Sequence, residues 1–118
     1  MQRFFGEWCC DEKMYSDIGR PSEEERQYGN TIFAVYERES YEGQCLIVFK
    51  KWSRTIDDDG KSTTTFQWYV IEASHCSCNG LEDAWPPKPT TKEALLMMEL
   101  GSFNEEVRLA FKQALEER

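Results

Sequence analysis

Three segments in the middle of the chain have the apolar-rich pattern typical of β-strands that are buried on both faces. Residues 31–37, 45–52 and 64–73 are rich in β-branched and aromatic side chains. Apolar residues fall on both faces of these segments, as in the run Leu46-Ile47-Val48-Phe49. We therefore expect helices or terminal segments to cover both sides of the sheet.

Turn-forming residues separate these three segments. Gly43 suits a hairpin connection between the first two. The second connection, Asp57-Asp58-Asp59-Gly60-Lys61-Ser62, resembles part of a calcium-binding loop, but Thr55 stands where an aspartate is needed and Phe66 replaces the expected glutamate. A hairpin turn is the favoured interpretation, and the three strands then form an antiparallel meander.

Helices are predicted at three places. Residues 1–20 are interpreted as irregular or a short strand, and Ser22 with Glu25 then forms a capping box for a short helix that stops at Gly29. Residues 85–89 form a stiff, proline-rich connector. After it, Thr90 or Thr91 caps a helix that is predicted to end at Gly101.

The last helix is predicted to start from Ser102, with Glu105 completing a second capping box. Its apolar residues fall at helical spacing and are expected to face the core: Phe103, Val107, Ala110, Phe111, Ala114 and Leu115. The sequence as a whole predicts one α+β domain over residues 1–118. In that domain a three-stranded, or slightly larger, antiparallel meander carries a short N-terminal helix and two packed C-terminal helices.

The net charge and the lengths of the apolar runs disfavour several classes of function. The 118 residues carry a net charge of −8, with a pI near 4.7, and this disfavours nucleic acid as a partner because phosphate is repelled. No apolar run approaches the ~20 residues that span a bilayer, and the N-terminus has no extended apolar region of a signal peptide. We expect a cytoplasmic protein without a membrane segment.

The most distinctive residues lie between positions 72 and 85. The lone histidine, His75, is followed at once by Cys76 and Cys78, and the chain holds five cysteines in all. A zinc site could combine these three residues with Cys9 or Cys10, although the spacing is not that of Cys-x2-Cys knuckles. A catalytic thiol, or buried thiols that only fill space, are the other interpretations, and the last is favoured.

Catalysis finds little support in the sequence. The chain has a single histidine and no glycine-rich phosphate loop, so most acid–base and phosphoryl-transfer schemes lack their usual groups. We therefore expect no enzyme and no cofactor, with zinc as the alternative.

Residues 66–96 resemble a group of small uncharacterised proteins from phages and prophages. The similarity rests on His75-Cys76-Ser77-Cys78 at a strand end, then Gly80-Leu81-Glu82, Trp85, and the helix that starts at Thr90-Thr91. An aromatic residue is expected in place of Asn79. The resemblance implies a phage accessory protein that acts on a host or defence factor in the host cytoplasm.

These observations favour a protein that binds another protein without catalysis, and in the phage setting an inhibitor is one form that such a protein takes. Trp85 is the expected anchor of that contact, with Glu82 and Asp83 beside it, since tryptophan is frequent at binding hot spots. A Trp85 side chain that covers the sheet is an equally weighted alternative. The alternative is a zinc-stabilised or redox-sensing module built on His75, Cys76 and Cys78 with Cys9 or Cys10.

Overall fold

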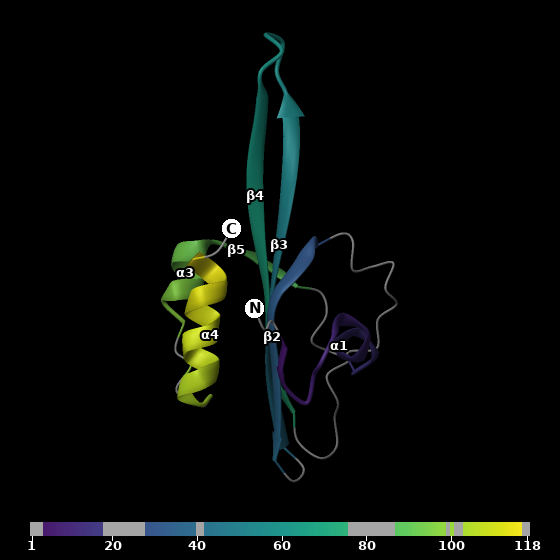
Figure 1. Cartoon of the computed structure of the whole chain (residues 1–118), viewed down its shortest axis with the longest axis vertical. Helices are drawn as coiled ribbons and strands as arrows, with labels where there is room; N and C mark the ends of the chain where they lie inside the picture. The colour runs from purple at the N-terminus through teal and green to yellow at the C-terminus, as the bar shows by residue number, and fades with distance from the viewer. Residues whose placement is uncertain are drawn as a thin grey trace.

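One β-sheet with helices on both faces makes up the body of the protein (Figure 1). The computed structural model describes residues 4–17, 28–39, 42–75, 87–98, 100 and 103–116. In chain order the elements are β1 (Phe4–Gly6), α1 (Asp11–Asp17), β2 (Asn30–Glu39), β3 (Glu42–Ile56), β4 (Ser62–His75), β5 (Lys88–Thr90), α3 (Lys92–Leu96) and α4 (Glu105–Glu116).

The sheet is larger than the sequence predicts, and it is mixed. Its five strands are hydrogen-bonded in the order β1-β2-β3-β4-β5. β1 runs parallel to β2, and all other neighbours are antiparallel. The predicted three-stranded, or slightly larger, antiparallel meander is therefore wrong, although the broader α+β class is confirmed. The two added edge strands have three residues each, too few to produce a recognisable alternation.

The predicted strand segments fall inside β2, β3 and β4, but β3 and β4 extend well beyond them. β3 covers 15 residues and β4 covers 14. The two strands pair without interruption from Gly43 opposite His75 to Ile56 opposite Ser62. The molecule measures 58 × 30 × 23 Å along its principal axes, and the β3–β4 hairpin forms one end of the longest axis (Figure 1).

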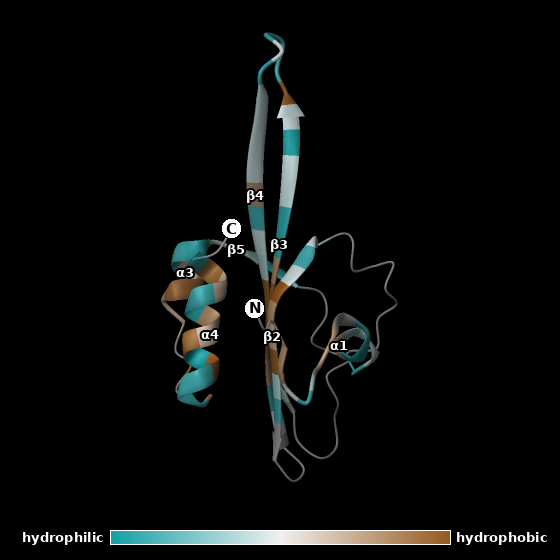
Figure 2. Cartoon of the chain, in the orientation of Figure 1, coloured by the Kyte–Doolittle hydropathy of each residue, from teal (hydrophilic) through white to brown (hydrophobic). Residues whose placement is uncertain are grey.

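Alternate residues of β3 supply two separate cores. Ile47 and Phe49 face the α1 side of the sheet, whereas Leu46 and Val48 face α3 and α4. Figure 2 shows this apolar band in the middle of the body strands. Both faces of the body are covered, as the apolar run in β3 indicates.

Helix α1 was not predicted, because residues 1–20 read as irregular. Only two of its seven residues are large and apolar, Met14 and Tyr15, and both are buried against the sheet. A seven-residue helix is too short for its 3.6-residue period to be visible, so packing on the sheet decides this element. Most of the helix predicted after Pro21 lies in residues 21–27, outside the described residues.

The C-terminal helices pack on the other face. The Thr91 hydroxyl accepts a hydrogen bond from Ala94 N at 3.1 Å, which confirms Thr91 as the cap of α3. α3 ends at Leu96, well before Gly101. Asn104 Oδ1 accepts from Val107 N at 2.9 Å and caps α4, so the predicted cap at Ser102 is wrong.

The apolar stripe of α4 behaves as predicted. Its members are buried, apart from the half-buried Ala110, and they pack on β2 and β3. Phe111 meets Phe33 edge to face, with ring centroids 5.3 Å apart. No helix among the described residues is long and apolar enough to cross a membrane.

Candidate functional site

The predicted cluster begins where β4 ends. His75 is the last residue of β4, and its backbone is paired with that of Gly43 on β3. The His75 side chain lies outside the described part of the structure, as do five further residues from the predicted metal and partner sites: Cys76, Cys78, Glu82, Asp83 and Trp85. The zinc site and the Trp85 contact therefore stay predictions. Within the described ranges, no three His, Cys, Asp or Glu side chains are grouped as metal ligands.

Cys45 has the structural role expected of a buried thiol. It is 1% exposed on β3 and packs in the core on the α1 side. Burial, with a smaller contribution from the negative charge of Glu72, raises the pKa of Cys45 to about 12. The thiol is therefore neutral and unreactive at physiological pH.

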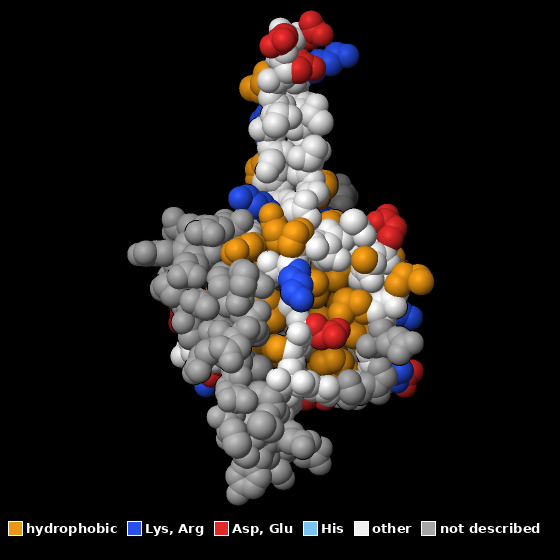
Figure 3. All heavy atoms as spheres, turned by 180° about the vertical axis from the view of Figure 1, so that it is seen from behind, with side chains coloured by type: hydrophobic (Ala, Val, Ile, Leu, Met, Phe, Trp, Pro, Cys, Tyr) orange, Lys and Arg blue, Asp and Glu red, His pale blue; other side chains and the backbone are white. Residues whose placement is uncertain are grey.

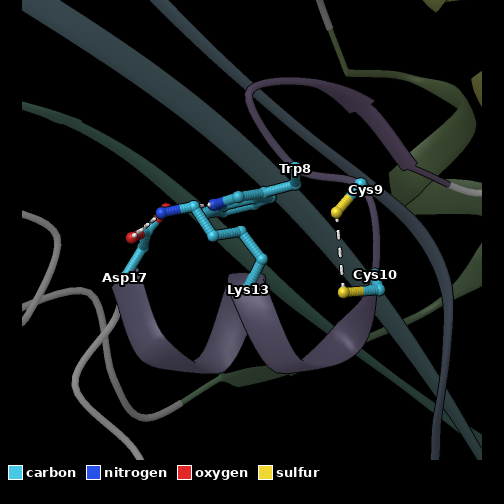
Figure 4. Close-up of polar contacts among 5 residues, drawn as sticks. All are labelled: Trp8, Cys9, Cys10, Lys13 and Asp17. Carbon is cyan, nitrogen blue, oxygen red and sulfur yellow. Dashed lines mark hydrogen bonds and ion pairs between the residues drawn. The ribbon is translucent and has the colours of Figure 1, made fainter.

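Cys9 and Cys10 are placed differently, between β1 and α1. Cys9 is exposed and Cys10 is half-buried. Their Sγ atoms face each other at 3.6 Å, and the Cys9 thiol donates a weak hydrogen bond to the Cys10 sulfur (Figure 4). This hydrogen bond, followed by the charge of a Cys10 thiolate, raises the pKa of Cys9 above its ordinary value, while Lys13 acts in the opposite direction. The two thiols are thus in direct contact at the surface.

The segment that carries these thiols is anchored on both sides. Before it, the Trp8 side chain is buried and its ring lies 5.2 Å from that of Tyr36 on β2. Trp8 Nε1 also donates to Asp17 Oδ2 at 2.8 Å (Figure 4). After it, the Cys10 carbonyl accepts the first helical hydrogen bond of α1 from Met14 N at 3.2 Å. These contacts fix the backbone on either side of the two sulfurs.

A long exposed feature of the described structure is the outer half of the β3–β4 hairpin, residues 51–67, which we call the ribbon. β2 pairs with β3 only as far as Lys50, and β5 pairs with β4 only from Trp68 to Val70. Beyond these points, and among the described strands, β3 and β4 pair only with each other. Every residue from 52 to 67 is exposed. The ribbon therefore projects from the body as two uncovered strands (Figure 1).

One face of the ribbon is aromatic. Trp52 and Phe66 are direct cross-strand partners and are 59% and 53% exposed, and Ile56 on the same face is 71% exposed. At the base of this face, Lys50 Nζ lies 4.2 Å from the Phe66 ring centroid and 4.7 Å from that of Trp68. Cation–π contacts of this kind hold the aromatic rings and the ammonium group together.

The opposite face of the ribbon carries small polar side chains at its centre. Ser53, Thr55, Thr63 and Thr65 occupy its central positions, and Ser53 pairs with Thr65 and Thr55 with Thr63. The Thr55 hydroxyl donates to the Thr63 carbonyl at 3.4 Å. The ribbon is thus amphipathic, although the described residues cover neither face.

Charge is also divided along the ribbon and its base. Lys50, Lys51 and Arg54 lie on the strands, and residues 50–56 and 62–68 contain no acidic residue. Three aspartates and Lys61 occupy the tip, where Figure 3 shows the charged side chains. The strands of the ribbon are therefore basic within a protein whose net charge is −8.

The predicted turn between the second and third strands is confirmed. Asp57 Oδ1 accepts hydrogen bonds from Asp59 N at 3.1 Å and Lys61 N at 2.8 Å. Gly60 adopts a φ of 82°, in the left-handed region that favours glycine. This turn chemistry fixes the register of the ribbon.

The sequence prediction identified these strands but not their exposure. Phe66 shares a face with Trp68 and Val70, as predicted, yet Trp68 and Val70 are half-buried and Phe66 is exposed. One available signal was the polar composition on both sides of the turn, Ser53-Arg54-Thr55 and Ser62-Thr63-Thr64-Thr65. Residues 53–55 and 62–65 contain no apolar side chain that could join a core.

Comparison of the chain with protein-family models, curated proteins and solved structures finds no match. The resemblance of residues 66–96 to phage proteins therefore stays a prediction. The site must be interpreted from its own geometry, and that geometry offers two features: the aromatic face of the ribbon and the adjacent thiols of Cys9 and Cys10.

Proposed function

We propose that this protein acts without catalysis, by inserting the aromatic face of its ribbon into an apolar cleft with an acidic rim on another protein. The observation that carries the proposal is the cross-strand pair Trp52 and Phe66. Both side chains are more than half exposed on a ribbon that no described part of the chain covers. Tryptophan and neighbouring aromatic residues are frequent anchors at protein interfaces.

Burial of this pair would supply a substantial part of the binding free energy. The exposed parts of Trp52 and Phe66 amount to roughly 200 Å² of apolar surface, taking ~150–250 Å² per aromatic side chain. At ~25 cal/mol per Å², their burial is worth about 5 kcal/mol. Association itself costs ~4–15 kcal/mol, so further contacts are required. Ile56 and the nearby cations are placed to make them.

The charges of the ribbon favour an acidic protein surface over nucleic acid. Lys50 and Arg54 share the face of the aromatic pair, whereas Lys51 lies on the polar face, and residues 50–56 and 62–68 contain no acidic residue. Proteins that bind DNA commonly neutralise ~6–10 phosphates, more than these cations can reach. The aspartates at the tip and the overall charge of −8 also repel phosphate. If the phage resemblance holds, a host or defence protein is the first partner class to search.

The test compares two double variants on opposite faces of the ribbon. The wild-type chain is used to capture a partner from host lysate, and the purified partner is then titrated against each variant by calorimetry. We expect W52A/F66A to weaken binding by roughly 30-fold or more, because hot-spot truncations cost ~2 kcal/mol or more. We expect T63A/T65A, the matched control on the polar face, to bind like the wild type.

Charge reversal gives an independent measurement. K50E/R54E should weaken binding to the same purified partner, and the loss should shrink as salt is raised, because exposed charges are screened. Equal binding by W52A/F66A and T63A/T65A would contradict the proposal.

Two other molecules could bind the aromatic face of the ribbon, and each would give a different experimental result. A dimer of the isolated protein in sedimentation, lost in W52A/F66A, would show that a second copy occupies the aromatic face. Binding of a purified oligonucleotide that depends on Trp52 and Phe66 would show that nucleic acid does. Either result would overturn the proposal.

A further inference from the structure

The contact between two neighbouring thiols is not explained by the protein-binding role. Adjacent residues in an extended chain direct their side chains to opposite faces. Cys9 and Cys10 instead bring their sulfur atoms to 3.6 Å, on the same side of the turn that leads into α1 (Figure 4). The anchors at Trp8 and at the start of α1 hold the backbone on both sides of this arrangement.

We propose that Cys9 and Cys10 form a redox-active dithiol, a modification site that low-molecular-weight disulfides such as glutathione disulfide convert reversibly to a Cys9–Cys10 disulfide. The site differs from Cys45, which is buried in the core. It also requires no third ligand or partner, in contrast to the zinc cluster predicted from the sequence.

The reaction proceeds by two thiol–disulfide exchanges. The Cys10 thiolate attacks one sulfur of glutathione disulfide, forms a mixed disulfide and releases one glutathione thiolate. The Cys9 thiol then loses its proton to solvent and attacks the Cys10 sulfur, which releases the second glutathione thiolate. The two cysteines lose two electrons and two protons in total, and the disulfide is reduced to two molecules of glutathione.

The geometry assigns the order of the two steps. The Cys9 thiol donates its hydrogen to the Cys10 sulfur at 3.6 Å, and this contact raises the pKa of Cys9, which therefore keeps its proton. Cys10 is therefore the attacking group. Once Cys10 is in a mixed disulfide, this stabilisation of the protonated Cys9 is lost, and the exposed Cys9 can act as the resolving thiol.

The resulting disulfide should be easy to reduce. Cα atoms of adjacent residues lie ~3.8 Å apart across a trans peptide, below the ~4.4–6.8 Å usual for disulfides. Strained and exposed disulfides have more oxidising potentials and belong to the labile, regulatory class. The dithiol would therefore be the resting form in a reducing compartment and would respond to oxidising conditions.

The test uses the full chain in glutathione buffers of increasing oxidation, quenched with acid and analysed by peptide mass spectrometry. We expect the peptide that holds Cys9 and Cys10 to lose two hydrogens without retaining glutathione, and dithiothreitol to reverse the change. Cys45 serves as an internal control and should stay reduced because it is buried.

Two single variants and a brief alkylation separate the roles of the two thiols. C9S should accumulate one glutathione on Cys10, because the resolving thiol is missing. C10S should likewise stop at one glutathione, on Cys9. In the wild-type chain, brief treatment with substoichiometric iodoacetamide should alkylate Cys10 several-fold faster than Cys9, because the Cys9 proton is held by the contact with Cys10. Circular dichroism is the control for folding. Both variants should keep the wild-type fold, because Cys9 is exposed and Cys10 is half-buried.

Three outcomes would overturn the proposal. They are a wild-type peptide that carries glutathione on both cysteines, a disulfide from either cysteine to another position, and no oxidation at glutathione ratios that oxidise strained disulfides. Equal alkylation of Cys9 and Cys10 in the wild-type chain would overturn the assignment of Cys10 as the attacking thiol.

Discussion

Trp8 Nε1 donates a hydrogen bond to Asp17 Oδ2 at 2.8 Å, which joins the segment between β1 and α1 to the last residue of α1. Trp8 is 2% exposed, so its indole N–H has lost its contact with water. The same carboxylate also meets Lys13 Nζ at 3.3 Å. This single side chain thus connects the buried tryptophan to the helix that covers one face of the sheet.

Removal of the Asp17 carboxylate should destabilise the fold. We expect Asp17→Ala to lower the free energy of unfolding by about 1–3 kcal/mol, because a buried donor is left without its acceptor. Urea denaturation measures the change. Asp17→Asn, which keeps a carbonyl acceptor, should cost less, and Glu12→Ala on the exposed side of α1 is the control for the loss of charge. Equal effects of Asp17→Ala and Glu12→Ala would contradict a role for the hydrogen bond.

Two glycines with similar backbone angles should respond very differently to substitution. Gly6 and Gly60 have φ values of 72° and 82°, so alanine at either position incurs the ~1–2 kcal/mol cost of a left-handed conformation. At Gly6 the new methyl group would also overlap the Tyr36 carbonyl, whereas at Gly60 nothing lies within 4 Å. We expect Gly60→Ala to cost about 1 kcal/mol and Gly6→Ala to cost clearly more in denaturant titrations. Similar midpoints for the two variants would exclude the close approach of β1 to β2.

Cys45 should make stability depend on alkaline pH. Its folded-state pKa of about 12 is raised from the ordinary value of 9.0. Between these values the unfolded chain has lost the thiol proton while the folded chain retains it, so stability falls as pH rises, by about 1.4 kcal/mol per pH unit at most. Below pH 9 this contribution is fully present.

The measurement is a series of denaturant titrations between pH 8 and pH 11. Cys45→Ala removes the titrating group and should flatten the alkaline part of the profile relative to the wild type, whatever its effect at neutral pH. A wild-type and a variant profile that fall in parallel would show that other groups cause the loss.

We expect the amide hydrogen-exchange rates to differ sharply between the body part and the ribbon part of β3. Amides of Leu46, Ile47 and Val48 lie in the body of the sheet with buried side chains on both faces, and we expect them to exchange only through global unfolding. Amides of the ribbon from Ser53 to Ile56 have a partner on one side only and should exchange orders of magnitude faster, through local opening. NMR on the isolated protein tests this, and uniform protection along β3 would show that the ribbon is covered in solution.

Local patterns in the sequence were sufficient for some elements because their determinants are near neighbours. The Asp57–Ser62 turn depends on a carboxylate and a glycine within six residues. The α4 stripe depends on apolar residues three and four apart, and Thr91 caps α3 through a contact three residues away. Such features are visible without knowledge of the partner strand or helix.

The candidate sites depended on contacts that the sequence does not contain. The sequence directed attention to His75, Cys76, Cys78 and Trp85, and the described structure reaches only the backbone of His75. The sequence offered no reason to expect contact between the sulfurs of Cys9 and Cys10, because the side chains of neighbouring residues in an extended chain point to opposite faces. Whether Trp52 and Phe66 join the core depends on where β2 and β5 stop pairing.

The amino-acid sequence by itself determined the strands of the central hairpin, the turn at its tip, the core face of α4 and the α+β class, because short-range periodicity and turn chemistry specify each of them. Tertiary structure alone decided the parallel pairing of β1 with β2, the docking of α1, and the length of ribbon left without a cover. The physical reason is that these depend on which distant segments meet, and so on burial shared between elements rather than on the preference of any one of them.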